Sequence, residues 1–173
     1  SVMNNPLIAE FIGTAILLLL GCGIVANVNL KKTKAEGQSP WVLITSAWGF
    51  SVFVGAYVAG KYSGAHLNPA VTIGLATAGK FTWKMVLPYM ISQLTGAMFG
   101  SWIVYLVYID HYRQTEDEKI VLSTFATGPA IRNFKNNFFS EFVGTFILVF
   151  CIFFIVNPNI TFDMVEKNRD KPW

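Results

Sequence analysis

The stretch from Ser63 to Thr72 combines polar groups that could handle a small solute inside a membrane. It lies within an uncharged segment, Tyr62–Gly79, that is dotted with glycine and alanine. Pro69 suits the first turn of a helix, where its missing N–H costs nothing, and Asn68 before it is a natural N-cap. A helix over residues 69–78 would rise about 15 Å, half of a bilayer core. The sequence therefore predicts a half-span that begins in mid-membrane.

The residues before this half-helix could line a path for the solute. Irregular backbone survives at membrane depth only where protein buries it or a water-filled path solvates it. The carbonyls of Gly64, Ala65 and His66 would then be free to accept hydrogen bonds, and the amide of Asn68 could donate them. The helix N-terminus carries roughly half a positive charge, which repels cations and protons. Together these groups indicate a path for small, neutral, hydroxylic molecules.

The composition places these groups in a membrane protein. Of the 173 residues, 53% are hydrophobic and 13% are charged, whereas soluble domains carry roughly 25% charged residues. The net charge of +3 is spread along the chain and forms no basic stripe, which argues against a nucleic-acid partner. We predict an all-α fold with about four transmembrane helices plus the re-entrant half-helix. The four uncharged or nearly uncharged runs are Pro6–Val28, Pro40–Gly60, Met85–Ile109 and Phe138–Val156.

Small residues recur at four-residue spacing within two of these spans. Ser92, Gly96 and Gly100 form one such stripe, and Ala56 and Gly60 form another. In lipid, where no hydrophobic effect drives helices together, small residues let helix backbones approach closely. We expect both stripes to serve helix packing.

An internal repeat indicates how the spans are organised. The nine residues from Glu10 reappear from Glu141 with six identities, at an offset of 131 positions. An odd number of spans separates the two copies, so the second would enter the membrane from the opposite face, as in the inverted repeats of pores and carriers. We expect residues 1–137 to form the first repeat, including a long polar loop from Asp110, and residues 138–173 to start the second. By this symmetry a complete second repeat would run to roughly position 240, so the pore would be truncated here.

The half-span and the repeated Glu-Phe-x-Gly-Thr motif together resemble the major intrinsic proteins, the family of aquaporins and glycerol facilitators. The resemblance runs from about Asn5 to Val156 and implies an aquaporin-like right-handed helical bundle, multi-pass in the plasma membrane, with four pores in a homotetramer and no cofactor or metal. It also implies a pore motif of Asn68, Pro69 and Ala70, lined by the carbonyls of Gly64, Ala65 and His66. The family's second Asn-Pro-Ala motif and its filter arginine have no counterpart in these residues.

Three further residues gain roles from the resemblance. Trp48 matches the aromatic residue of the outer selectivity filter, which is tryptophan in glycerol facilitators; an ordinary packed or lipid-facing tryptophan is the alternative. Glu10 and Glu141 are carboxylates inside spans, where such groups are expensive unless hydrogen-bonded. The residues alone allow a proton relay, whereas the family favours carboxylates that each brace a re-entrant loop.

We therefore expect a passive channel for glycerol, water and other small uncharged solutes that excludes protons and ions. The alternative is a truncated, non-conducting membrane fragment that at most associates with full-length subunits. An enzyme is not expected, because the spans carry no His/Asp/Glu cluster, Ser-His pair or metal-ligand spacing.

Overall fold

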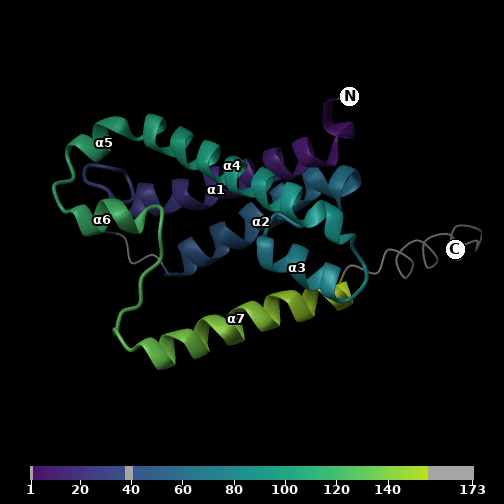
Figure 1. Cartoon of the computed structure of the whole chain (residues 1–173). Helices are drawn as coiled ribbons and strands as arrows, with labels where there is room; N and C mark the ends of the chain where they lie inside the picture. Colours follow the sequence, from purple (N-terminus) through teal and green to yellow (C-terminus); the bar gives the residue numbers. More distant parts are fainter. Residues whose placement is uncertain (1, 38–40, 156–173) are drawn as a thin grey trace, which may run out of the picture. The chain divides into compact units, whose positions relative to one another are not determined.

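The computed structural model describes residues 2–37 and 41–155, and all regular structure in these residues is helical (Figure 1). Four of the helices are long and apolar enough to span a membrane, which confirms the predicted all-α membrane fold with four spans. Residues 156–173, which include Val156 at the end of the predicted fourth span and all of the chain after it, lie outside the described residues, as does Pro40. The four spans are α1 (Pro6–Asn29), α2 (Trp41–Ser63), α4 (Trp83–Val107) and α7 (Phe134–Ile155).

The helix ends differ from the apolar runs by a few residues. Helix α2 continues past Gly60 through Lys61 to Ser63, and α4 begins at Trp83, two residues before the predicted start. Hydropathy marks which residues lie in lipid, whereas backbone hydrogen bonding decides where a helix ends, so a charged residue in the last turn does not stop the helix.

The long polar connection that begins near Asp110 contains two short helices that the sequence did not predict, α5 (Ile109–Arg113) and α6 (Glu118–Ser123). Asp117 caps α6 by accepting a hydrogen bond from the backbone N–H of Lys119 at 2.8 Å. Tertiary contacts hold the pair: the buried Tyr112 hydroxyl hydrogen-bonds with Thr124 at 2.8 Å. Helices this short show no readable hydrophobic period.

Helices α5 and α6 lie beside the connection that follows α1 (Figure 1). The side chain of Asn29 donates to Ser123 Oγ at 3.1 Å, and the backbone N–H of Lys31 donates to Thr115 Oγ1 at 3.0 Å. Within the connection, the Glu36 carboxylate accepts from Lys31 Nζ and from the backbone N–H of Lys32, and these bonds lower the pKa of Glu36. This end of α1 is therefore covered by folded chain.

Helix α1 is the centre of the first compact unit, residues 1–130, and packs against both α2 and α4. A Cβ atom built on Gly96 would lie 2.3 Å from the backbone oxygen of Phe11, and one on Gly100 would lie 2.3 Å from that of Ala15. Only glycine allows helices to approach this closely. The glycines of the predicted stripe on α4 therefore pack against α1. In the other stripe, a Cβ built on Gly60 of α2 meets no described atom within 4 Å, so Gly60 makes no such close contact in the described residues.

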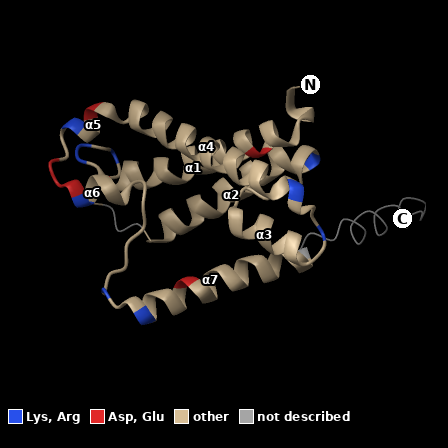
Figure 2. Cartoon of the chain, in the orientation of Figure 1, with Lys and Arg blue, Asp and Glu red and all other residues tan. Residues whose placement is uncertain are grey.

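Charged residues gather at helix ends and connections, while the middles of the long helices are almost free of them (Figure 2). This distribution fits helices that cross a hydrocarbon layer. The second compact unit, residues 131–173, contains α7 as its described helix.

Candidate functional site

The half-helix α3 (Pro69–Thr77) begins where the sequence predicts. Asn68 is its N-cap, with extended backbone (φ −153°, ψ 127°), and its side-chain oxygen Oδ1 accepts from the backbone N–H of Ala70 at 2.8 Å. Because Oδ1 is the capping acceptor, the two hydrogens of Nδ2 point elsewhere. No described residue accepts a hydrogen bond from Nδ2, which leaves this donor available at the start of the half-helix.

The loop before α3 has an unusual backbone. Gly64, Ala65 and Leu67 all have positive φ, at 84°, 50° and 53°. Glycine adopts such angles freely, whereas each of the other two costs on the order of 1–2 kcal/mol. A conformation of this kind persists only when its surroundings hold it in place.

Glu10 of α1 provides that support. One carboxylate oxygen, Oε1, accepts from the Ser63 hydroxyl at 2.6 Å and from the backbone N–H of His66 at 2.9 Å. The other, Oε2, accepts from the backbone N–H of Leu67 at 2.8 Å and from Gln93 Nε2 at 2.9 Å. Glu10 is fully buried, and its hydrogen bonds to the loop and to α4 satisfy both oxygens.

Three residues of this network had no role in the sequence analysis. Gln93 of α4 also donates to Thr72 Oγ1 at 2.9 Å, and the Thr72 hydroxyl lies 3.0 Å from His66 Nδ1. Tyr89 donates to the backbone oxygen of Ser63 at 2.9 Å. A signal was available for Gln93, because an amide within an apolar span is expensive unless it is hydrogen-bonded. Thr72 and Tyr89 give no such signal, because both types are common in membrane helices.

The carbonyls of the loop are the second available set of polar groups. Within the described residues, no donor reaches the backbone oxygens of Gly64, Ala65 or His66. Gly64 is exposed and Ala65 is half-buried. The loop therefore presents consecutive free acceptors beside the free donor of Asn68, the combination that a hydroxyl group needs.

Two buried polar atoms near Glu10 have no hydrogen-bond partner among the described residues, Thr14 Oγ1 and Gln93 Oε1. Thr14 lies one helical turn after Glu10 and is 3% exposed. We expect Thr14→Val to leave the free energy of unfolding unchanged or to raise it by up to about 1 kcal/mol, because it removes an unsatisfied hydroxyl without changing the shape of the side chain. Chemical unfolding of the detergent-solubilised chain would measure this.

The matched control for Thr14→Val is Thr72→Val, which removes a hydroxyl with several partners. We expect this control to lower the free energy of unfolding by about 1–3 kcal/mol. A loss of that size in Thr14→Val would instead show that the Thr14 hydroxyl has a partner.

Trp48 of α2 contacts α1 at a point far along the helix from Glu10. Its half-buried indole covers Gly21 of α1, where a Cβ would lie 2.3 Å from the ring, and packs against the core cluster of Cys22 and Leu30. Gly21 is eleven residues after Glu10 on the same helix, which corresponds to about 16 Å along the axis. The structure therefore does not bring Trp48 into the hydrogen-bonded network of the loop.

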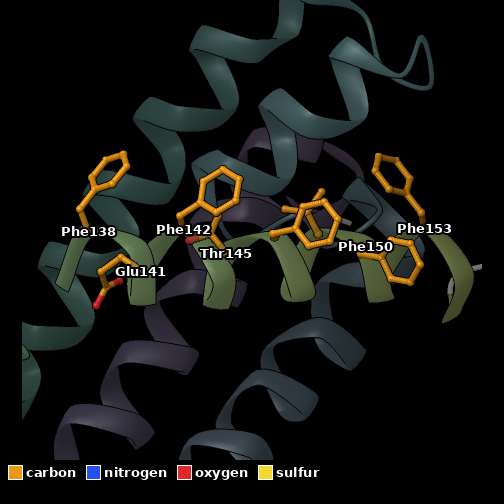
Figure 3. A pocket seen from close by; sticks show the side chains of 8 residues that line it. Phe138, Glu141, Phe142, Thr145, Phe150 and Phe153 are labelled. Atoms are coloured by element: carbon orange, nitrogen blue, oxygen red, sulfur yellow. The ribbon is translucent and has the colours of Figure 1, made fainter. Parts of the chain in front are cut away.

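Glu141 has a different environment from Glu10. It is exposed on α7 and accepts no hydrogen bond from a described residue. It borders an open hollow of about 490 Å³ along α7, lined mostly by phenylalanine (Figure 3). The lining side chains are Phe138, Glu141, Phe142, Thr145, Phe146, Val149, Phe150 and Phe153.

The described residues contain no group of three or more His, Cys, Asp or Glu side chains that could hold a metal ion. The carbonyls of the loop and the amide of Asn68 are themselves neutral hydrogen-bond acceptors and donors.

Comparison with known proteins identifies the family. Residues 2–165 match the profile of the major intrinsic proteins. The chain is 51% identical over 151 residues to the glycerol uptake facilitator protein of Streptococcus pneumoniae, covering 87% of this chain and 64% of that protein. It is 48% identical over 142 residues to the probable glycerol uptake facilitator protein of Thermotoga maritima, covering 82% and 60%. The glycerol facilitator-aquaporin of Lactococcus lactis subsp. lactis is 42% identical over 152 residues, covering 83% and 52%.

The chain spans between half and two thirds of the length of these relatives. With its family and its four span-forming helices, it is an integral protein of the plasma membrane. The match covers both the half-helix and the repeated Glu-Phe-x-Gly-Thr motif, and it makes this chain a member of the major intrinsic protein family.

Proposed function

We propose that this chain supplies the first half of a passive channel for glycerol, and that water and other small uncharged solutes use the same path. One observation carries the proposal: within the described residues, the carbonyls of Gly64, Ala65 and His66 and the Nδ2 group of Asn68 at the start of the half-helix have no hydrogen-bond partner. Such a row exchanges hydrogen bonds with a polyol as it moves, without holding it tightly. The names of the relatives support glycerol as the solute.

In this proposal Asn68, Pro69 and Ala70 form the pore motif, and Glu10 holds the loop rigid. The positive end of α3 repels cations and protons at the same point, so the path passes neutral molecules. The chain supplies no catalysis. The protein assembles as a homotetramer, as the family resemblance implies, and residues 1–137 and 138–173 belong to two inverted repeats. Glu141 would brace a second loop as Glu10 braces the first.

Light scattering from proteoliposomes that hold the protein in its full encoded length tests the proposal. We expect glycerol entry to be faster than into empty vesicles of the same lipid. Equal rates would refute a glycerol channel. The same measurement on vesicles with residues 1–173 alone tests the alternative, a non-conducting fragment. Glycerol conduction by that chain would rule the alternative out.

Trp48 is proposed as one wall of a selectivity filter, where its indole contacts the carbon backbone of a polyol. We expect Trp48→Phe to reduce the ratio of glycerol to water permeability by roughly threefold to tenfold, which corresponds to about 0.7–1.4 kcal/mol of lost contact. Trp41→Phe is the matched control, because Trp41 is exposed at the first residue of α2. If the ratio is unchanged in Trp48→Phe, Trp48 is no part of the filter.

A further inference from the structure

An open groove of about 470 Å³ lies in the first compact unit, and α1, α2 and α4 each supply part of its lining. Its volume is in the range of sites that hold a small organic molecule. Most of the lining is apolar, with Leu19, Leu20 and Ile24 from α1, Phe50 from α2 and Val107 from α4. Neither Trp48 nor any residue of the loop before α3 lines the groove, so it is separate from the proposed solute path.

The groove extends over about the depth of one leaflet of a bilayer. Along α1 it runs from Leu19, near the middle of the helix, to Asn27, two residues before the helix ends. This span corresponds to about 12 Å, whereas half of a hydrocarbon core is about 15 Å. Tyr108, which directly follows α4, lines the groove as well. One end of the groove therefore lies at the level of the lipid headgroups and the other near the middle of the membrane.

The polar side chains at the headgroup end have hydrogen-bonding capacity to spare. Asn27 and Tyr108 are half-buried, and neither side chain forms a hydrogen bond with a described residue. The third polar residue of the lining, Ser51, is different, because its hydroxyl donates to the backbone oxygen of Ala47 at 2.6 Å. The Asn27 amide has two hydrogens to donate, and the Tyr108 hydroxyl has one. The groove is thus apolar along its length and has free donors at one end.

This pattern matches an amphipathic lipid better than a protein segment. An acyl chain would lie against the apolar walls, where contact with water is excluded. The ester and phosphate oxygens of the same lipid would lie at the level of Asn27 and Tyr108, and they only accept hydrogen bonds. At the middle of the groove, a Cβ built on Gly23 meets no described atom within 4 Å, so Gly23 leaves room for the chain.

We propose that this groove binds one acyl chain of a bilayer glycerophospholipid, and that Asn27 and Tyr108 donate hydrogen bonds to its ester or phosphate oxygens. All glycerophospholipids share these oxygens, so the site recognises the chain and its depth, not one headgroup. The proposal goes beyond the proposed function and does not depend on it. We expect this lipid to stay with the protein when the rest of the bilayer is removed.

Photo-crosslinking in the full-length protein tests what occupies the groove. Phe50 is replaced by p-benzoylphenylalanine; Phe53, on the same helix and similarly exposed (69% and 65%) but outside the groove, is the matched control position. The protein is moved from nanodiscs of palmitoyl-oleoyl phosphatidylglycerol into mild detergent, freed of unbound lipid and irradiated. We expect at least about fivefold more phospholipid adduct at position 50 than at position 53, because burial of the chain holds the lipid in the groove.

Three results of this crosslinking would overturn the proposal. A product with the mass of two subunits would show that a second copy of the chain fills the groove. A crosslink to residues of the full-length protein after position 173 would show that the rest of the chain fills it. Equal adduct yields at the two positions, or no lipid adduct at position 50, would show that no lipid is held there.

Filling the groove from within tests the same site independently. Gly23→Leu places a side chain in the groove, and Gly49→Leu is the matched control, because Gly49 also has no described atom within 4 Å of a Cβ but does not line the groove. We expect native mass spectrometry to show at least about fivefold less retained phospholipid in Gly23→Leu and no change in Gly49→Leu. Unchanged retention in folded Gly23→Leu would overturn the proposal.

A double variant tests the polar end and replaces Gly23→Leu if that variant does not fold. Asn27→Leu with Tyr108→Phe keeps the side-chain sizes but removes the donors, so retained phospholipid should fall by about threefold to tenfold. Tyr105→Phe is the control, because Tyr105 does not line the groove. Unchanged retention in the double variant would contradict the roles of Asn27 and Tyr108.

Discussion

Replacing Gly96 or Gly100 by alanine is expected to destabilise the protein strongly. Each new Cβ would lie 2.3 Å from a backbone oxygen of α1, a separation that requires the helices to move apart. Backbone atoms cannot turn away as the end of a flexible side chain can. We expect a loss of roughly 1–3 kcal/mol for each variant and a larger loss for the pair. Chemical unfolding of the detergent-solubilised chain would measure it.

Gly23→Ala and Gly49→Ala are the matched controls for these substitutions. Both glycines lie within long helices, and a Cβ on either meets no described atom within 4 Å. Alanine favours a helix over glycine by about 0.5–1 kcal/mol, so the controls should be neutral or slightly stabilising. Equal effects in all four variants would mean that the close contact of α1 and α4 does not decide stability.

The second large effect is expected for Glu10→Ala. The substitution removes the acceptor of four donors, two of them backbone N–H groups in a loop with positive φ angles. Each buried donor left without a partner costs about 1–3 kcal/mol. Since the donors can partly rearrange, we expect a total loss of at least about 3 kcal/mol. We also expect the amide hydrogens of His66 and Leu67 to exchange faster with solvent.

Glu141→Ala tests whether this loss depends on the network. Glu141 occupies the equivalent position of the repeated motif but is exposed and accepts no hydrogen bond from a described residue. We expect its substitution in the 173-residue chain to change the free energy of unfolding by less than about 0.5 kcal/mol. A similar loss in both variants would contradict the role of the Glu10 network in holding the loop.

Local sequence patterns, each formed by residues that are close together along the chain, predicted most of the fold. The apolar runs marked the four spans, and Asn68-Pro69 marked the start of the half-helix. Both features depend on residues that are neighbours along the chain. Helices α5 and α6 were missed because their stability comes from contacts such as Tyr112 with Thr124, not from a local pattern.

The candidate site was predictable in part. The repeated motif and the family resemblance singled out Glu10 as a partner of the loop. Its link to Gln93 and onward to Thr72 joins α1, α4 and α3, and such a link depends on how the helices pack. The stripe of Gly96 and Gly100 predicted a close helix contact without showing that α1 would be the partner. Contacts between distant segments require the three-dimensional arrangement.

The central claim is that the loop held by Glu10 forms the wall of the solute path. The most direct test is the glycerol permeability of the full-length protein in proteoliposomes, compared between wild type and Glu10→Gln and normalised to the folded protein recovered by size exclusion. The amide cannot accept all four hydrogen bonds, so the loop loses its support. We predict that glycerol permeability falls at least about tenfold, the equivalent of about 1.4 kcal/mol. Unchanged permeability in folded Glu10→Gln would contradict the claim.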